Sequence, residues 1–190
     1  MKNLTVALVV LLLSGCTATL FETPPLAARG CDPAAQGAWL SVPKASDAEG
    51  EHSRLRVDAA CRLVVDEIRG GDVTSSAPVQ LHLGRHAGEH YAWFDANWML
   101  EVGGADTRVA QGDVVVVRYR LQDGTLDIWP VSDKAVDALH AQGKLVRRYE
   151  EPEEYEELRW ITGPANPAVL ELDGLFDTEA NQFRPEDPPR

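Results

Sequence analysis

Three histidines at a regular interval are the first candidates for chemistry. His82, His86 and His90 are spaced by four residues, and on a helix they would share one face and could ligate zinc or copper. However, residues 79–83 alternate between apolar and polar types, the period of a half-buried strand. We therefore expect a hairpin with exposed histidines, His86 at its tip and no high-affinity metal site. A weak zinc or copper site is the alternative, because His82 and His90 could approach each other across the turn.

Several common catalytic motifs are missing. The chain contains no G-x-S-x-G nucleophile elbow, no H-E-x-x-H zinc motif and no Walker or G-x-G-x-x-G phosphate loop. Its thirty Asp and Glu residues are too numerous to single out a catalytic pair. We expect no catalytic residue and no cofactor, and we favour a role other than that of an enzyme. A metal-binding or hydrolytic protein that uses the histidines is the alternative.

The first fifteen residues have the layout of an export signal. Lys2 supplies a short positive region, residues 6–13 form an uncharged apolar run, and small residues follow. A transmembrane helix needs roughly 20 apolar residues, so this run is too short to span a bilayer. Leu13-Ser14-Gly15-Cys16 at its end resembles the lipobox of bacterial lipoproteins. The resemblance implies a diacylglyceryl group on the Cys16 thiol, cleavage before Cys16 and acylation, as by palmitate, of the new amine.

The lipobox resemblance implies a lipid-anchored protein of the cell envelope. Several acyl chains, each contributing about 0.8 kcal/mol per buried methylene, make such attachment effectively permanent. Thr17 follows the cysteine, whereas an Asp there retains enterobacterial lipoproteins in the inner membrane. We therefore expect the outer membrane, facing the periplasm. The alternative is an ordinary secretory signal with an incidental cysteine.

The acidic composition narrows the class of partner. The formal net charge is −12 at pH 7, and a nucleic-acid-binding protein needs a basic surface. We therefore expect no nucleic acid partner. Anionic lipid head groups would also repel the chain, so we expect the lipid on Cys16, and no basic patch, to hold it at the membrane.

Two cysteines remain once Cys16 is assigned to lipid. Cys31 and Cys61 are an even pair in an oxidising compartment, so we expect a disulfide. It would close a loop of about thirty residues and stabilise the fold by roughly 3–4 kcal/mol in the chain-entropy model. The alternative is two free, buried thiols. No C-x-x-C motif supports a redox or zinc-ribbon site.

The strand signals predict a β-rich domain between two irregular ends. Residues 16–30, which include Pro24-Pro25, are interpreted as a lipidated tether, residues 31–183 as a single domain and residues 184–190 as a disordered tail. Apolar, β-branched or alternating runs suggest further strands. These runs cover residues 38–42, 55–57, 61–68, 79–83, 90–94, 98–102, 145–149 and 160–162.

The clearest element is a β-hairpin that turns at Asp123-Gly124. Residues 114–122 and 125–129 are rich in strand-forming types, and Asp-Gly between them is typical of a two-residue type I′ turn. Such a turn sets the register, with two apolar pairs on the core face and a charge pair and a cation–π pair on the other. The pairs are Leu121 with Leu126, Tyr119 with Ile128, Arg120 with Asp127, and Arg118 with Trp129.

Capping residues predict short helices later in the chain. Ser132 is a good N-cap and Gly143 a fitting C-terminal stop, so residues 133–142 should form a helix. Asn166 and the proline after it predict a second short helix through residue 172. The glutamate-rich residues 150–158 could start a further short helix at Pro152, and we interpret them as a solvated face.

Two resemblances bear on the fold. Gly37-Ala38-Trp39 resembles the Gly-x-Trp signature of lipocalins, and the hairpin sequence resembles the YRL-DGTL-W pattern of lipocalin-like envelope lipoproteins. They imply a fold neighbourhood and no activity. We expect one mainly β domain with short helices (α+β), built as a curved antiparallel sheet or a small open, lipocalin-like barrel.

The sequence leaves three functions open. The first is a non-catalytic envelope lipoprotein that binds an envelope protein partner or has a structural role. The second is a lipocalin-like carrier of a small apolar ligand, in which the five tryptophans line a cavity instead of filling a core. The third is the histidine-based protein named above.

Overall fold

The computed structural model describes residues 16–44, 51–151 and 156–186. Within them the chain is mainly β, as predicted, with short helices. The strands are β1 (Cys16–Phe21), β2 (Gly37–Ser41), β3 (Glu51–Val57), β4 (Arg62–Arg69), β5 (Asp72–Ser75), β6 (Val79–Gln80), β7 (His82–His86), β8 (Glu89–Asp95), β9 (Val114–Gln122), β10 (Thr125–Pro130), β11 (Arg147–Glu150), β12 (Glu156–Ile161) and β13 (Asn181–Pro185). The helices are α1 (Ala96–Val102), α2 (Asp133–Ala141) and the 3-10 helices η1 (Pro33–Ala35) and η2 (Pro167–Glu171).

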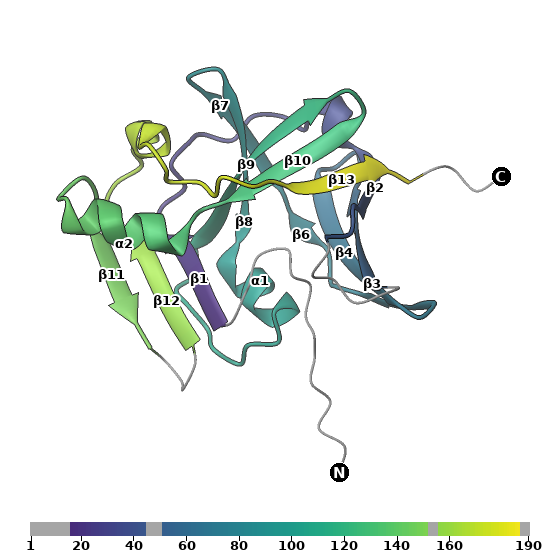
Figure 1. Cartoon of the computed structure of the whole chain (residues 1–190), viewed down its shortest axis with the longest axis horizontal. Helices are drawn as coiled ribbons and strands as arrows, with labels where there is room; N and C mark the ends of the chain where they lie inside the picture. Colours follow the sequence, from purple (N-terminus) through teal and green to yellow (C-terminus); the bar gives the residue numbers. More distant parts are fainter. Residues whose placement is uncertain (1–15, 45–50, 152–155, 187–190) are drawn as a thin grey trace, which may run out of the picture.

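The strands form one curved sheet (Figure 1). Its main path runs β11-β12-β1-β9-β10-β13-β2-β3-β4-β5, and β8 joins the second edge of β9. Residues 79–86 bring distant parts of the sheet together, because β6 pairs with β4 and β7 pairs with β8. The sheet wraps around a core without closing, which confirms the expected curved sheet or open barrel. It is mixed rather than wholly antiparallel, because β1 and β12 are parallel.

Two apolar cores lie on opposite faces of the sheet. The inner core includes Leu20, Tyr119 and Phe183. The outer core includes Phe21 and Val136 and lies between the sheet and the helices α2 and η2. Successive residues of a strand point to opposite faces. The valine run that opens β9 is therefore apolar throughout, because its residues enter the two cores alternately.

The β9–β10 hairpin has the predicted register, and all four predicted pairs occur in its ladder. Asp123 and Gly124 have φ values of 53° and 74°, both positive as a type I′ turn requires. On the core face Tyr119 is buried and Ile128 is half-buried against the inner core. The turn and the pattern of burial thus agree.

The outward face of the hairpin agrees with the prediction in part. Arg118 lies over the ring of Trp129 at 4.9 Å, the expected cation–π contact. Arg120 and Asp127, the expected charge pair, face each other in the ladder, but each side chain contacts another residue. The Arg120 guanidinium lies 3.8 Å from Glu89, and the carboxylate of Asp127 accepts a hydrogen bond from a glutamine of β13.

The structure corrects the tether predicted for residues 16–30. Residues 16–21 form β1, which pairs with β12 at six positions, and Leu20 and Phe21 are 0% and 2% exposed. The alternation of polar and apolar residues in this strand covers only Thr17 to Leu20, and Phe21 then adds an apolar side chain to the face that enters the outer core. The folded domain therefore already includes β1 and does not begin at residue 31. The predicted export signal, residues 1–15, lies outside the described residues.

A second correction concerns residues 98–102, which were expected to form a strand and belong to α1. The Asp95 carboxylate accepts a hydrogen bond from the backbone N–H of Trp98 at 2.9 Å, which caps the helix. Met99 and Leu100 are buried on the face that α1 turns to the core. A short apolar run does not distinguish a strand from a helix, and the preceding aspartate was the missed signal.

A third correction concerns the tail predicted from residue 184. Arg184 and Pro185 belong to β13 and pair with Leu40 and Trp39 of β2. The backbone N–H of Glu186 donates to the β2 strand as well. Proline is tolerated there because the pairing of β13 with β10 covers residues 181–183, so among the described residues no strand partner lies where the missing N–H of Pro185 would point. Residues 187–190 lie outside the described part of the chain.

Two of the predicted helices are present in the described part of the chain. In α2, Val136 and Leu139 are buried, although the N-cap Ser132 makes no side-chain capping hydrogen bond. The helix predicted after Asn166 is η2, and the one predicted at Pro152 lies outside the described residues.

The predicted disulfide links Cys31 and Cys61, whose Cα atoms are 5.4 Å apart. Cys61 lies in the turn between β3 and β4, and its carbonyl accepts a hydrogen bond from Leu81. The disulfide joins the segment before β2 to the β3–β4 turn, and the hydrogen bond joins that turn to Leu81, between β6 and β7.

Candidate binding cleft

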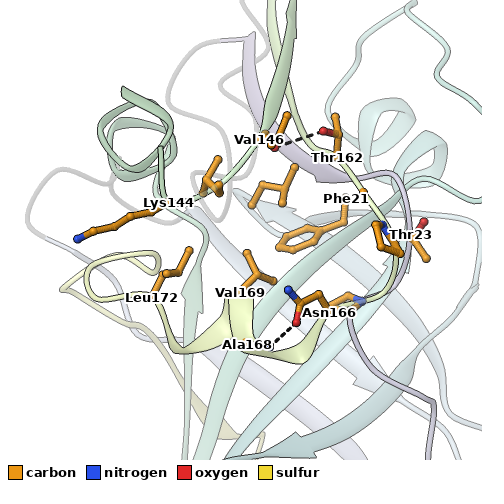
Figure 2. Close-up of a pocket in the computed structure, with 14 residues that line it drawn as sticks. Phe21, Thr23, Lys144, Val146, Thr162, Asn166, Ala168, Val169 and Leu172 are labelled. Carbon is orange, nitrogen blue, oxygen red and sulfur yellow. Dashed lines mark hydrogen bonds between the residues drawn. The ribbon is translucent and has the colours of Figure 1, made fainter. Parts of the chain in front are cut away.

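A cleft of about 340 Å³ opens at the carboxyl ends of the parallel strands β1 and β12. Phe21 and Ile161 are the last residues of these strands and pair with each other in the ladder. The opposite wall is η2, and the residues that precede β11 complete the rim (Figure 2). Small-molecule sites have volumes of about 300–1,000 Å³. The cleft is therefore at the lower end of that range.

The inner surface of the cleft is apolar. Phe21, Leu145 and Ile161 form a floor in which no residue is more than 8% exposed. Val169 and Leu172 line the opposite side and are half-buried, and Figure 2 shows the Phe21 ring reaching toward Val169. All five belong to the outer core or pack against it. The cleft is thus an unfilled extension of that core.

Polar side chains lie at the rim. The Thr162 hydroxyl donates to the carbonyl of Val146 at 3.4 Å, and Asn166 Oδ1 accepts from the backbone N–H of Ala168 at 3.1 Å. Figure 2 shows the Asn166 amide nitrogen directed into the cleft and the Lys144 amine directed outward from its edge. The amide nitrogen is therefore placed to donate to a bound group.

The cleft differs in charge from the rest of this acidic chain. None of its fourteen lining residues is Asp or Glu, although the chain contains thirty such residues. Lys144 is the charged side chain among those fourteen, and within the described residues it has no ion-pair partner. The local potential should therefore be more positive than that of the surrounding surface.

Local contacts hold both walls of the cleft. Gly143, with φ of +69°, ends α2 and turns the chain so that the backbone N–H of Lys144 donates to the Leu139 carbonyl at 2.9 Å. On the other side, His86 Nε2 lies 2.6 Å from the Glu171 carboxylate of η2. The wall made by η2 is therefore tied to the tip of the β7–β8 hairpin.

The predicted histidine hairpin is present, and its three histidines have separate contacts. His82 stacks on Trp93 with ring centroids 5.8 Å apart, and His90 packs edge-on against Tyr119 at 5.4 Å. In contrast, His86 contacts η2, as described above. Within the described ranges, no group of three or more His, Cys, Asp or Glu side chains is arranged to hold a metal ion.

The tryptophans are spread over the molecule and do not line the cleft. Trp39, Trp93 and Trp160 are buried in the two cores, and Trp98 and Trp129 are half-buried. Burial within packed cores is the commoner use of such large side chains. The sequence left open whether the tryptophans line a cavity or fill a core, and this arrangement favours the core.

Ser41 and Lys44 have the Ser-x-x-Lys spacing that is found in some acyl-transfer enzymes. Here it falls at the end of the extended strand β2. The Ser41 hydroxyl oxygen accepts a hydrogen bond from the backbone N–H of Ser53 at 2.9 Å. Lys44 donates to the Asn181 side chain at 2.7 Å. Both residues thus join neighbouring strands, and we assign them no chemistry.

A buried charge cluster outside the cleft supports the sheet. Asp66 is 0% exposed and accepts hydrogen bonds from Arg54 at 2.7 Å, from Arg56 at 2.8 Å and from Ser75 at 2.6 Å. Burial alone would raise the pKa of Asp66, but these hydrogen bonds outweigh burial and hold the pKa well below its ordinary value. The charged carboxylate thus joins β3, β4 and β5.

The sequence did not reveal the cleft because its lining residues come from three separate segments: residues 21–25, 144–146 and 161–172. The Asn166 cap was recognised, but nothing in the sequence brings these segments together. Comparison with known proteins finds no matching family model, curated protein or solved structure. Across the described residues, none of the helices has the length and apolar character needed to span a membrane. The cleft itself offers apolar contact beside one cation, which suits binding.

Proposed function

We propose that this chain is a lipid-anchored protein of the bacterial envelope, acylated on Cys16, that binds a ligand non-catalytically through the cleft beside Phe21. The position of Cys16 carries the proposal. It is the first residue of β1, so a chain cut before Cys16, as the lipobox resemblance implies, keeps all of the described strands. The anchor and the fold would then meet at a single residue, without a tether.

The same strand separates the anchor from the cleft. From Cys16 to Phe21 is five residue steps, which span about 17 Å at the usual strand rise. In Figure 1, β1 and β12 begin at the same edge of the sheet, and η2 lies toward their other ends. A ligand would therefore reach the cleft from the aqueous side, which is the periplasm for an outer-membrane protein.

The runner-up is a lipocalin-like carrier that holds a small apolar ligand inside the curved sheet. Leu20, Trp39, Tyr119 and Phe183 occupy that interior and are at most 7% exposed. Densely packed side chains leave little room for a ligand in a small barrel. This packing favours a ligand in the outer cleft over one inside the sheet.

The anchor is tested with Cys16→Ser in the full chain, produced in a bacterium. The wild-type protein should partition into a detergent phase and carry the mass of a diacylglyceryl group and an acyl group. The variant should lose both properties. The matched control is the double change Cys31→Ser and Cys61→Ser, which also replaces cysteines but should partition like the wild type. Detergent partitioning of Cys16→Ser equal to that of the wild type would contradict the proposal.

A further inference from the structure

We infer that the cleft binds an amphiphilic anion, with an apolar chain over Phe21 and an anionic head group beside Lys144. The inference rests on the binding role proposed above and names the class of ligand. Three features carry it: exposed apolar surface at the rim, the sign of the charge there, and the small number of free polar groups in the cleft.

Exposed apolar surface lies at the rim of the cleft. Val146 lines the cleft and is 66% exposed, beside the buried Leu145 and Ile161 of the floor. Covering apolar surface is favourable by about 25 cal/mol per Å². An alkyl chain on the floor would extend the outer core and cover Val146.

The charge at the rim selects the head group. The ammonium of Lys144 and the amide nitrogen of Asn166 can both donate to an anion, and no carboxylate lines the cleft to compete or to attract a cation. Lys144 is exposed, so its contribution should be modest, as for other exposed ion pairs. The head group therefore adds selectivity, and the chain provides most of the affinity.

The polar groups of the cleft favour a simple chain over a peptide. Each peptide residue brings an N–H and a C=O that need partners. Of the polar side chains that line the cleft, Thr162 donates to Val146 and Asn166 Oδ1 accepts from Ala168, which leaves the Asn166 amide nitrogen, Lys144 and Thr23 to contact a ligand. The cleft can therefore satisfy one head group but not a run of peptide groups.

The test uses the full acylated protein, released from non-ionic detergent and examined by native mass spectrometry with dodecanoate as the probe. One dodecanoate should be retained per chain, at concentrations at which dodecyltrimethylammonium and dodecanol are not. Ala168→Trp fills the cleft from an exposed position and should lower dodecanoate occupancy at least tenfold. Lys144→Ala should weaken binding about two- to fivefold. Lys134→Ala, a change of an exposed lysine of α2 outside the cleft, should have no effect.

Three outcomes would overturn the inference. Equal retention of the cationic or neutral probe removes the head-group argument, and binding that survives Ala168→Trp lies elsewhere. If a peptide with an apolar C-terminal residue is retained in place of dodecanoate and Ala168→Trp blocks it, the cleft is a binding site but the ligand class is wrong. If the wild-type protein made in a bacterium carries no acyl group on Cys16 and still binds dodecanoate, the proposed anchor is contradicted but this inference stands.

Discussion

The β9–β10 hairpin and the β1–β12 ladder each pair six positions in the same sheet, but they are specified differently. In the hairpin, two turn residues separate the strands, and the turn sets which residues face each other. In the β1–β12 ladder, Cys16 pairs with Glu156 and Phe21 with Ile161, so the partners are distant in sequence. No local turn positions them.

The two regions also differ in the pattern that they leave in the sequence. The hairpin has one face in the core and one toward solvent, so the buried Tyr119 alternates with the exposed Arg120. In β1, Leu20 enters the inner core and Phe21 the outer core. In β1 the polar–apolar alternation covers only Thr17 to Leu20, and it is interrupted when the apolar Phe21 follows on the outer face. The comparison therefore explains why the hairpin was predicted and β1 was mistaken for a tether.

The largest expected effect is that of Leu20→Ala in β1. Leu20 is 0% exposed, and removing a buried leucine side chain usually costs about 2–5 kcal/mol of unfolding free energy. Urea denaturation should therefore show a large fall in stability, with a much smaller change for Thr17→Ala in the same strand, where the residue is half-buried. If residues 16–30 were a tether after all, Leu20→Ala would change the free energy of unfolding by no more than about 0.5 kcal/mol.

An intermediate effect is expected for Gly124→Val at the hairpin turn. Gly124 has φ of +74°, and a β-branched residue there should cost about 1–3 kcal/mol in backbone strain. Gly124→Asn is the matched control, because asparagine tolerates positive φ, and should be much less destabilising. Thermal unfolding of the two variants measures the difference. Equal stability of Gly124→Val and the wild type would show that the turn does not determine the register.

The smallest effect is expected for Arg120→Ala on the outward face of the hairpin. Arg120 lies 3.8 Å from Glu89, and both side chains are well exposed, so the change should cost well under about 1 kcal/mol. Arg118→Ala should cost more, because Arg118 is half-buried over the Trp129 ring. The same urea series compares the two. A larger loss for Arg120→Ala than for Arg118→Ala would mean that the contact of Arg118 with Trp129 stabilises the hairpin less than the exposed ion pair of Arg120 does.

The candidate site was less predictable than the fold. The Asn166 cap and the Gly143 stop were visible, because a cap depends on residues within one turn of it. However, the cleft also needs Phe21 and Ile161, which meet only through the β1–β12 ladder. The hairpin predicted around the three histidines is present. Their side chains have separate partners. The regular interval in sequence therefore does not bring the three side chains to one site.

By itself, the sequence determined the β9–β10 register, the Cys31–Cys61 bond and the helix α2. The hairpin and the helix depend on residues close together in the chain, and the disulfide on the count of cysteines left after Cys16 is assigned to lipid. Only the tertiary structure decided that β1 belongs to the sheet and that a cleft forms at its carboxyl end. Both depend on pairing between distant segments, whose energy comes from burial on two faces and has no local sequence pattern.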